Sequence, residues 1–110
     1  MLGCKHGNIQ CQIVPFADPT RRALYFRKHG AEFAVATEGA YEAMAERFMN
    51  LPLRQPVLEC VRRNGDRVRF DPTTDEFGIA RSIGAILSYY KPQPAVHLRP
   101  SNMQYFREQC

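Results

Sequence analysis

Two short segments of the sequence hold the residues best suited to chemistry. The first reads YFRKHGAEF and contains Lys28 next to His29. The second reads LSYYKP and supplies Ser88, Tyr90 and Lys91. Histidine accepts or donates a proton near neutral pH, and lysine holds negatively charged groups. Together these residue types suit acid–base chemistry on an anionic substrate.

His29 also has a simpler interpretation, because it falls at the end of an expected helix. The last carbonyls of a helix are unsatisfied and its macrodipole is negative there, so positive charge is favoured. Arg27, Lys28 and His29 would meet that preference without any proton transfer. The residues alone leave both interpretations open. His6 and His97 fall in expected loops and have weaker claims, although His97 precedes the last expected helix and could approach the same cleft.

Two helices are expected in the first half of the chain. Asp18 can cap the first, with Pro19 at its first helical position, and Gly30 is a natural C-cap. Thr37 can cap the second, EGAYEAMAERFMN at residues 38–50, in which apolar side chains recur every three or four positions. His29 is thereby placed on the last turn of the first helix.

Beyond residue 56 the apolar pattern changes to a period of two, which indicates strands. Asn64-Gly65-Asp66 is a strong hairpin turn, and PTTD and SIG are further turns. Four strands are therefore expected, at residues 57–63, 67–71, 76–81 and 85–91. Ser101, with Gln104 three residues later, forms a capping box that starts a short final helix over 101–109.

This order of elements predicts an α+β fold, with N-terminal helices packed on one face of a four-stranded antiparallel meander and a short C-terminal helix. The other face of the sheet would be open to a ligand. Alternation places Arg67 and Arg69 on the opposite side from Val68 and Phe70. With Arg62 from the preceding strand, these arginines are expected to form a basic stripe on the open face.

The chain of 110 residues is long enough for a single core, and we expect an arm at 1–17 and one domain at 18–110. A net charge of +4 and a pI near 9.1 suit a polyanionic or acidic partner. No apolar run could span a bilayer, and the start lacks the layout of a signal peptide, so neither membrane contact nor an export signal is expected.

The cysteines and the absent motifs argue against several functions. The four cysteines have no CxxC spacing, so reduced thiols are expected, with Cys60 as a small core hydrophobe. Cys4, His6 and Cys11 offer three zinc ligands without a fourth. There is no glycine-rich phosphate loop, HExxH or GxGxxG. We therefore expect no metal and no cofactor.

In combination, the segments KHGAEF, EGAYEAMAERFMN, VLECVRRNGDRVRFDPTTDEFGIA, SYYKP and PSNMQYF resemble a known family. It comprises the C-terminal ribonuclease toxin domains of bacterial polymorphic and contact-dependent inhibition systems, in the barnase/EndoU/colicin/RelE superfamily. The histidine-containing KH element is similar to that of colicin D. The resemblance covers about residues 25–107.

The resemblance implies a metal-independent RNA endonuclease, often directed at transfer RNA, that cleaves by attack of the 2′-hydroxyl. Its implied partners are RNA and an acidic immunity protein or antitoxin, and it would be a monomer when unbound. It would act in the bacterial cytoplasm, either delivered as part of a larger secreted protein or as a stand-alone toxin.

The same resemblance assigns roles to residues of the two segments YFRKHGAEF and LSYYKP. His29 would be the catalytic histidine, Lys28 and Lys91 would stabilise phosphate charge, and Ser88 would bind the phosphate or the 2′-hydroxyl. Tyr90 would stack a base or assist proton transfer. These residue types fit the reaction in their own right, because cleavage without metal needs a base, an acid and fixed positive charge on the phosphorane.

Four arginines are expected to bind the nucleic acid: Arg62, Arg67, Arg69 and Arg81. Leu87 stands where the family pattern has an arginine, and Arg69 or Arg81 would supply the missing charge. That substitution favours an alternative function, a non-catalytic RNA-binding module that uses the sheet arginines and Tyr90. A third candidate is a structural or interaction domain of a phage or mobile element, in which the charge merely solubilises the fold.

Overall fold

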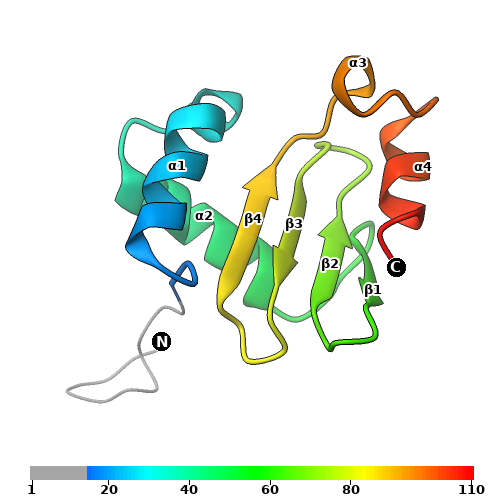
Figure 1. Cartoon of the computed structure of the whole chain (residues 1–110), viewed down its shortest axis with the longest axis horizontal. Helices are drawn as coiled ribbons and strands as arrows, with labels where there is room; N and C mark the ends of the chain where they lie inside the picture. The colour runs from blue at the N-terminus through cyan, green and yellow to red at the C-terminus, as the bar shows by residue number, and fades with distance from the viewer. Residues whose placement is uncertain (1–14) are drawn as a thin grey trace.

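The computed structural model describes residues 15–110, where helices come first, then a sheet, then two short helices (Figure 1). The helices are α1 (Pro19–His29), α2 (Glu38–Asn50), α3 (Pro94–His97) and α4 (Asn102–Arg107), and the 3-10 helix η2 (Gly30–Phe33) follows α1. The strands are β1 (Leu58–Val61), β2 (Arg67–Phe70), β3 (Phe77–Ala80) and β4 (Ile86–Tyr90). Neighbours in sequence pair antiparallel in the order β1-β2-β3-β4, so the predicted α+β meander is confirmed. None of these helices is long and apolar enough to cross a membrane.

Side-chain caps start the three longer helices where the sequence predicts them. Asp18, Thr37 and Ser101 each accept a hydrogen bond from the backbone N–H three residues later, at 2.7, 3.1 and 3.1 Å. Such caps satisfy N–H groups that the first turn leaves unpaired. The short helix α3 was not predicted, although Pro94 at its first position is a usual start signal.

Gly30 is the C-cap of α1, as predicted, and its backbone N–H donates to the Phe26 carbonyl. It keeps helical angles (φ −55°, ψ −38°) instead of the left-handed conformation common at this position, and the chain continues through η2 to Ala34, whose φ is 56°. Gly30 is needed for space, because a Cβ there would lie 2.7 Å from Phe26 Cδ1. The added turn of η2 brings Glu32 back beside His29.

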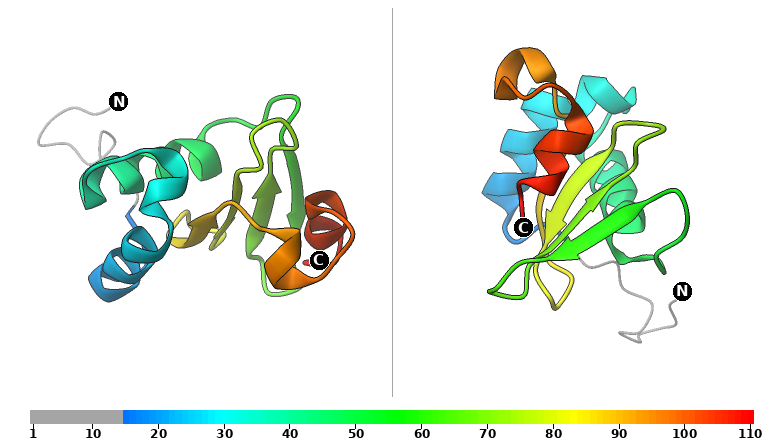
Figure 2. Two further views of the ribbon diagram at one scale, coloured as in Figure 1. Left: turned by 90° about the horizontal axis from the view of Figure 1, so that it is seen from above. Right: turned by 90° about the vertical axis from the view of Figure 1, so that its right-hand side faces the viewer.

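Helices lie on both faces of the sheet (Figure 2). On one face α2 approaches β3 so closely that a Cβ at Gly78 would come within 2.6 Å of Met49 Sδ. On the other face, Phe106 of α4 stacks on Phe70 of β2, with 5.8 Å between the ring centroids. The face predicted to be open is therefore partly covered by α4. Helix α1 packs beside β4. The uncovered part of that face lies between α1 and the two C-terminal helices, α3 and α4 (Figure 1).

Two clusters of buried side chains hold these layers together. The first joins α2 to the sheet and includes Tyr41 and Tyr89, both fully buried. The second lies under α4 and includes Phe70 and Phe106. Phe16, within the segment expected to be an arm, is buried in the first cluster and forms an isolated bridge with Ile86.

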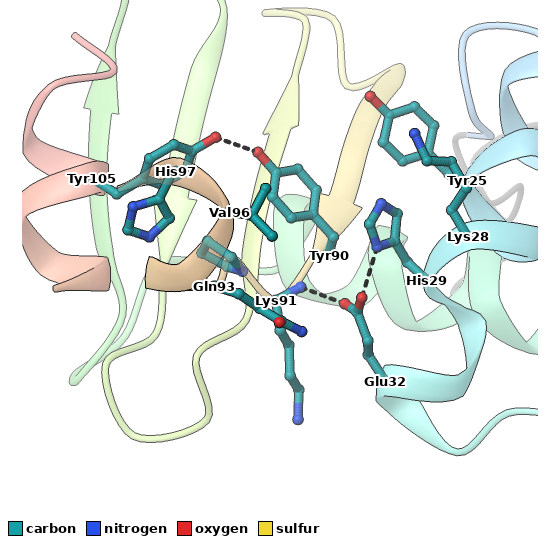
Figure 3. A pocket seen from close by; sticks show the side chains of 11 residues that line it. Tyr25, Lys28, His29, Glu32, Tyr90, Lys91, Gln93, Val96, His97 and Tyr105 are labelled. Carbon is teal, nitrogen blue, oxygen red and sulfur yellow. Dashed lines mark hydrogen bonds and ion pairs between the residues drawn. The ribbon is translucent and has the colours of Figure 1, made fainter. Parts of the chain in front are cut away.

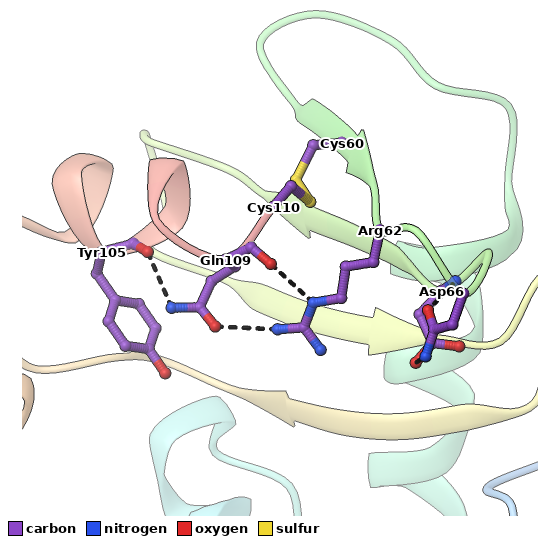
Figure 4. The surroundings of a disulfide bond; sticks show 7 residues. Cys60, Arg62, Asp66, Tyr105, Gln109 and Cys110 are labelled. Carbon is purple, nitrogen blue, oxygen red and sulfur yellow. Dashed lines mark hydrogen bonds between the residues drawn. A yellow bond between two sulfur atoms is a disulfide. The ribbon is translucent and has the colours of Figure 1, made fainter.

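A disulfide joins Cys60 of β1 to Cys110 after α4 (Figure 4). The prediction of reduced thiols is therefore wrong for this pair, and Cys60 is not a free core hydrophobe. The two cysteines are 50 residues apart in sequence and meet only because α4 folds back over the sheet. The expectations about Cys4, His6 and Cys11 concern residues outside the described part of the chain.

Candidate active site

A cleft of about 430 Å³ opens between the end of α1 and the two C-terminal helices (Figure 3). The end of β4 and the residues after it lie between these two sides. Four of the residues predicted as catalytic line the cleft: Lys28, His29, Tyr90 and Lys91. His97 lines it from the opposite side, as expected from its position before the last helix. The fold thus brings together residues more than 60 positions apart in sequence.

The His29 ring is fixed on three sides. Its Nδ1 lies 2.7 Å from Glu32 Oε2, and Glu32 Oε1 accepts a hydrogen bond from the Lys91 backbone N–H, also at 2.7 Å. The imidazole packs between Tyr25, at 5.7 Å between ring centroids, and Tyr90, at 5.1 Å. The side chains of His29 and Glu32 are 20% and 21% exposed. Glu32 therefore connects the histidine to the end of β4.

These contacts define what the two nitrogens of His29 can do. A carboxylate only accepts hydrogen bonds, so Nδ1 carries a proton and donates it to Glu32. In the neutral ring this leaves Nε2 without a proton. Nε2 has no hydrogen-bond partner among residues 15–110, and it faces the cleft between Tyr25 and Tyr90 (Figure 3). In this tautomer the lone pair of Nε2 is available to accept a hydrogen bond or a proton.

Ser88 lies beside this arrangement and not in the cleft lining. It is 7% exposed, and its Oγ donates to the Tyr25 hydroxyl at 3.3 Å. The Tyr25 ring, by contrast, lines the cleft with Lys28. Ser88 therefore does not line the cleft itself and is connected to it through the Tyr25 hydroxyl.

Tyr90 and Lys91 point in different directions, as alternation along a strand requires. The Tyr90 hydroxyl lies 2.6 Å from the Tyr105 hydroxyl. Burial, the larger cause, and this hydrogen bond, the second, raise the pKa of Tyr90 above its ordinary value. The Tyr90 side chain is therefore uncharged and forms part of the cleft wall. The Lys91 ammonium lies over the Phe33 ring at 5.5 Å and points away from His29 (Figure 3).

His97 has both ring nitrogens in use. Its Nδ1 accepts from the Arg99 backbone N–H at 3.1 Å, and Nε2 lies 2.9 Å from Asn102 Oδ1. These partners select the neutral tautomer with the proton on Nε2. The ring stacks on Tyr105, with 4.4 Å between centroids and 16° between planes. His97 is thus a fixed part of the cleft wall and not a free proton carrier.

The expectation that Arg67 and Arg69 lie on an open face is wrong, because theirs is the face that α2 covers. Arg69 is 7% exposed, and its guanidinium donates to Glu59 at 2.6 Å and to the carbonyls of Phe48 and Leu51 at 3.0 and 2.8 Å. Arg67 likewise donates to the end of α2 and to Glu59. Both arginines satisfy carbonyls that the helix C-terminus leaves unpaired.

Arg62 and Arg81 also lie apart from the cleft lining. Arg62 donates to the backbone carbonyl and the side-chain oxygen of Gln109, at 2.8 and 3.0 Å, next to the disulfide (Figure 4). Arg81 is exposed in the hairpin between β3 and β4, at the opposite end of β4 from Tyr90. The predicted arginine stripe is therefore not assembled beside His29.

Several cleft residues were not predicted from the sequence: Tyr25, Glu32, Gln93, Val96 and Tyr105. Glu32 had a usable signal, since it follows His29 by three residues, a spacing that joins side chains on a helical turn. Tyr105 had no such signal in the sequence, because only the return of α4 over the sheet brings its hydroxyl next to the Tyr90 hydroxyl.

Comparison with known proteins supports the fold. No protein-family model and no curated protein sequence matches the chain. Among solved structures, it is similar to a ribonuclease from Escherichia coli that was solved in complex with its inhibitor protein. The two share 21% sequence identity and a TM-score of 0.53, over 78% of this chain and 95% of that one. The chain therefore has the fold of a bacterial ribonuclease.

Proposed function

We propose that this protein is a metal-independent endoribonuclease of the toxin type. The observation that carries the proposal is the His29–Glu32 pair, which leaves His29 Nε2 facing a cleft that Lys28 also lines. Cleavage of an RNA phosphodiester by its own 2′-hydroxyl requires a proton acceptor and a positive charge near the phosphate. The fold shared with a bacterial ribonuclease adds support.

In this reaction Nε2 of His29 removes the proton of the 2′-hydroxyl, and the 2′-oxygen attacks phosphorus. The bond to the 5′-oxygen breaks, so the products are a 2′,3′-cyclic phosphate and a free 5′-hydroxyl. The leaving oxygen takes up a proton, for which the Tyr25 hydroxyl and the Lys28 ammonium are candidate donors in the cleft. Glu32 stabilises the imidazolium that forms, since its carboxylate is 2.7 Å from Nδ1.

The biological setting is part of the same proposal. The basic net charge of +4 suits RNA, and we infer a transfer RNA target and an acidic immunity protein or antitoxin as inhibitor. The similar E. coli ribonuclease was itself solved with an inhibitor protein. We further propose that the protein acts in the bacterial cytoplasm after delivery within a larger secreted protein. The alternative of an RNA-binding module loses support, because its three sheet arginines are engaged in intramolecular contacts.

The direct test is to incubate the wild type and His29→Ala with total bacterial RNA in EDTA and to resolve the products on a denaturing gel. Loss of the histidine is expected to reduce cleavage by roughly a hundred- to ten-thousandfold. Arg27→Ala is the matched control, since Arg27 is an exposed cation on the same last turn of α1. If His29 acted only as helix-terminal charge, the two variants would lose activity equally. Full activity of His29→Ala, with an unchanged thermal melt, would refute the assignment.

A further inference from the structure

The cleft extends well beyond His29, to a wall formed by α3 and α4. We propose that this wall, made of Gln93, Val96, His97 and Tyr105, is a binding site for a nucleobase of the RNA. The base would be the one that adjoins the cleaved phosphodiester. This inference rests on the proposed ribonuclease function and adds to it the group that selects where the enzyme cuts.

Aromatic rings fix the shape of the wall. His97 and Tyr105 stack at 4.4 Å, and Phe77 contacts both Tyr105, at 5.3 Å, and Tyr90, at 5.2 Å. The hydroxyl of Tyr105 is tied to that of Tyr90 at 2.6 Å. The surface is therefore rigid before any ligand arrives. Proteins that bind single-stranded nucleic acids gain affinity by stacking bases on such aromatic surfaces.

Val96 adds an apolar contact that the folded chain does not use. Its side chain is 78% exposed although it lines the cleft. Ile83 is equally exposed, at 79%, but lies in the turn between β3 and β4, outside the cleft lining. A planar base seated in the cleft would cover Val96 and leave Ile83 in water. Burial of apolar surface is favourable by about 25 cal/mol per Å².

Gln93 supplies the polar group that can read the edge of a base. Within residues 15–110 its side-chain amide has no hydrogen-bond partner, whereas both nitrogens of His97 are occupied. The amide presents an N–H donor beside a carbonyl acceptor, which match adjacent groups on a base edge, as in glutamine–adenine pairs. A glutamate at this position would only accept, and so would suit the two neighbouring donors of guanine.

Tyr90 connects this wall to the reacting atoms. The Tyr90 ring stacks on the His29 ring, with 5.1 Å between the centroids, and the Tyr90 hydroxyl is hydrogen-bonded to the Tyr105 hydroxyl. A base on the wall therefore leaves its own sugar and phosphate over Tyr90, toward His29 Nε2. Base and 2′-hydroxyl of one nucleotide would occupy the two halves of one cleft (Figure 3).

The test measures binding of the four nucleoside 3′-monophosphates by NMR titration, with the ring signals of His97 and Tyr105 as reporters. Wild-type protein is expected to bind one base in preference, with shifts in both rings. Val96→Ser should weaken binding about fivefold through lost apolar contact, and Ile83→Ser should not change it. Gln93→Glu should lower the affinity for the adenine nucleotide relative to the guanine nucleotide, because a carboxylate cannot donate to adenine and accepts from both donors of guanine.

Three results would overturn the inference. They are no binding of any nucleotide, binding that leaves both ring signals in place, or the same ratio of adenine to guanine affinity in Gln93→Glu as in the wild type. Because the assay needs no cleavage, these results are separate from failure of the ribonuclease proposal, which would appear as unimpaired cleavage by His29→Ala. A protein that cuts RNA but fails the titration would keep its proposed function and lose this base site.

Discussion

Glu32→Gln removes the charge that orients His29 while preserving the shape of the side chain. In the native protein the two carboxylate oxygens serve two different donors, His29 Nδ1 and the Lys91 backbone N–H, each at 2.7 Å. An amide keeps a single oxygen, so one of these donors loses its acceptor. We expect kcat for RNA cleavage to fall and KM to stay within about twofold, because the contact matters most when His29 becomes charged.

The size of the effect follows from the contact. A hydrogen bond to a charged group contributes about 1.5–3 kcal/mol when it is shielded from water. The two side chains are 20% and 21% exposed, so little is lost to solvent screening. If the bond acts mainly in the transition state, kcat should decrease by roughly ten- to a hundredfold.

The assay combines kinetics with a spectroscopic readout of the ring. Initial rates on a defined RNA give kcat and KM, and ¹⁵N NMR of His29 reports which nitrogen carries the proton. The variant should gain the tautomer with the proton on Nε2. Glu38→Gln is the control, since Glu38 is also an acidic partner, bonded to Arg22 at 3.0 Å away from the cleft. An unchanged kcat and tautomer in Glu32→Gln, with His29→Ala inactive, would refute the positioning role.

Three further outcomes concern stability, measured by urea unfolding. Arg69→Ala should cost about 3 kcal/mol, because it removes the shorter of the two arginine contacts to Glu59 and leaves the Phe48 and Leu51 carbonyls without this donor. The exposed Arg63→Ala should cost less than about 0.5 kcal/mol, and equal costs would contradict the structure. Cys110→Ser should cost about 2–4 kcal/mol, since the disulfide closes a separation of 50 residues, and native stability in this variant would count against the bond. Stability should also fall above about pH 10, the pKa of an unfolded tyrosine, by up to about 1.4 kcal/mol per pH unit for each buried phenol. Burial raises the folded-state pKa of three tyrosines, Tyr41, Tyr89 and Tyr90, so their ionisation favours the unfolded chain. A free energy of unfolding that stays constant between about pH 10 and 12 would exclude this explanation.

Features set by neighbouring residues could be predicted from the sequence. The caps Asp18, Thr37 and Ser101, and the hairpin turn at Gly65 with its φ of 94°, depend on contacts within a few positions. The meander could be predicted because short turns join its strands, and strands joined by short turns pair antiparallel with their neighbours in sequence. The place of His29 at the end of α1 could also be predicted, although the residues alone did not separate a catalytic role from a helix-end charge.

Features set by packing could not be predicted in the same way. Alternation assigned Arg67 and Arg69 to one face, but it does not say which face a helix will cover. Cys60 and Cys110 have no local pattern and are joined only in the folded sheet. Glu32 reaches His29 through the added turn of η2, which the usual preference of glycine for a helix end does not predict.

The distribution of tyrosines gives the protein an optical probe of its own cleft. The chain has five tyrosines and no tryptophan, so its ultraviolet fluorescence comes from tyrosine alone. Three of them, Tyr25, Tyr90 and Tyr105, line the cleft. The remaining two are fully buried and give a constant background. A molecule that enters the cleft should therefore change the emission of the unlabelled protein, and its arrival and departure can be followed in real time.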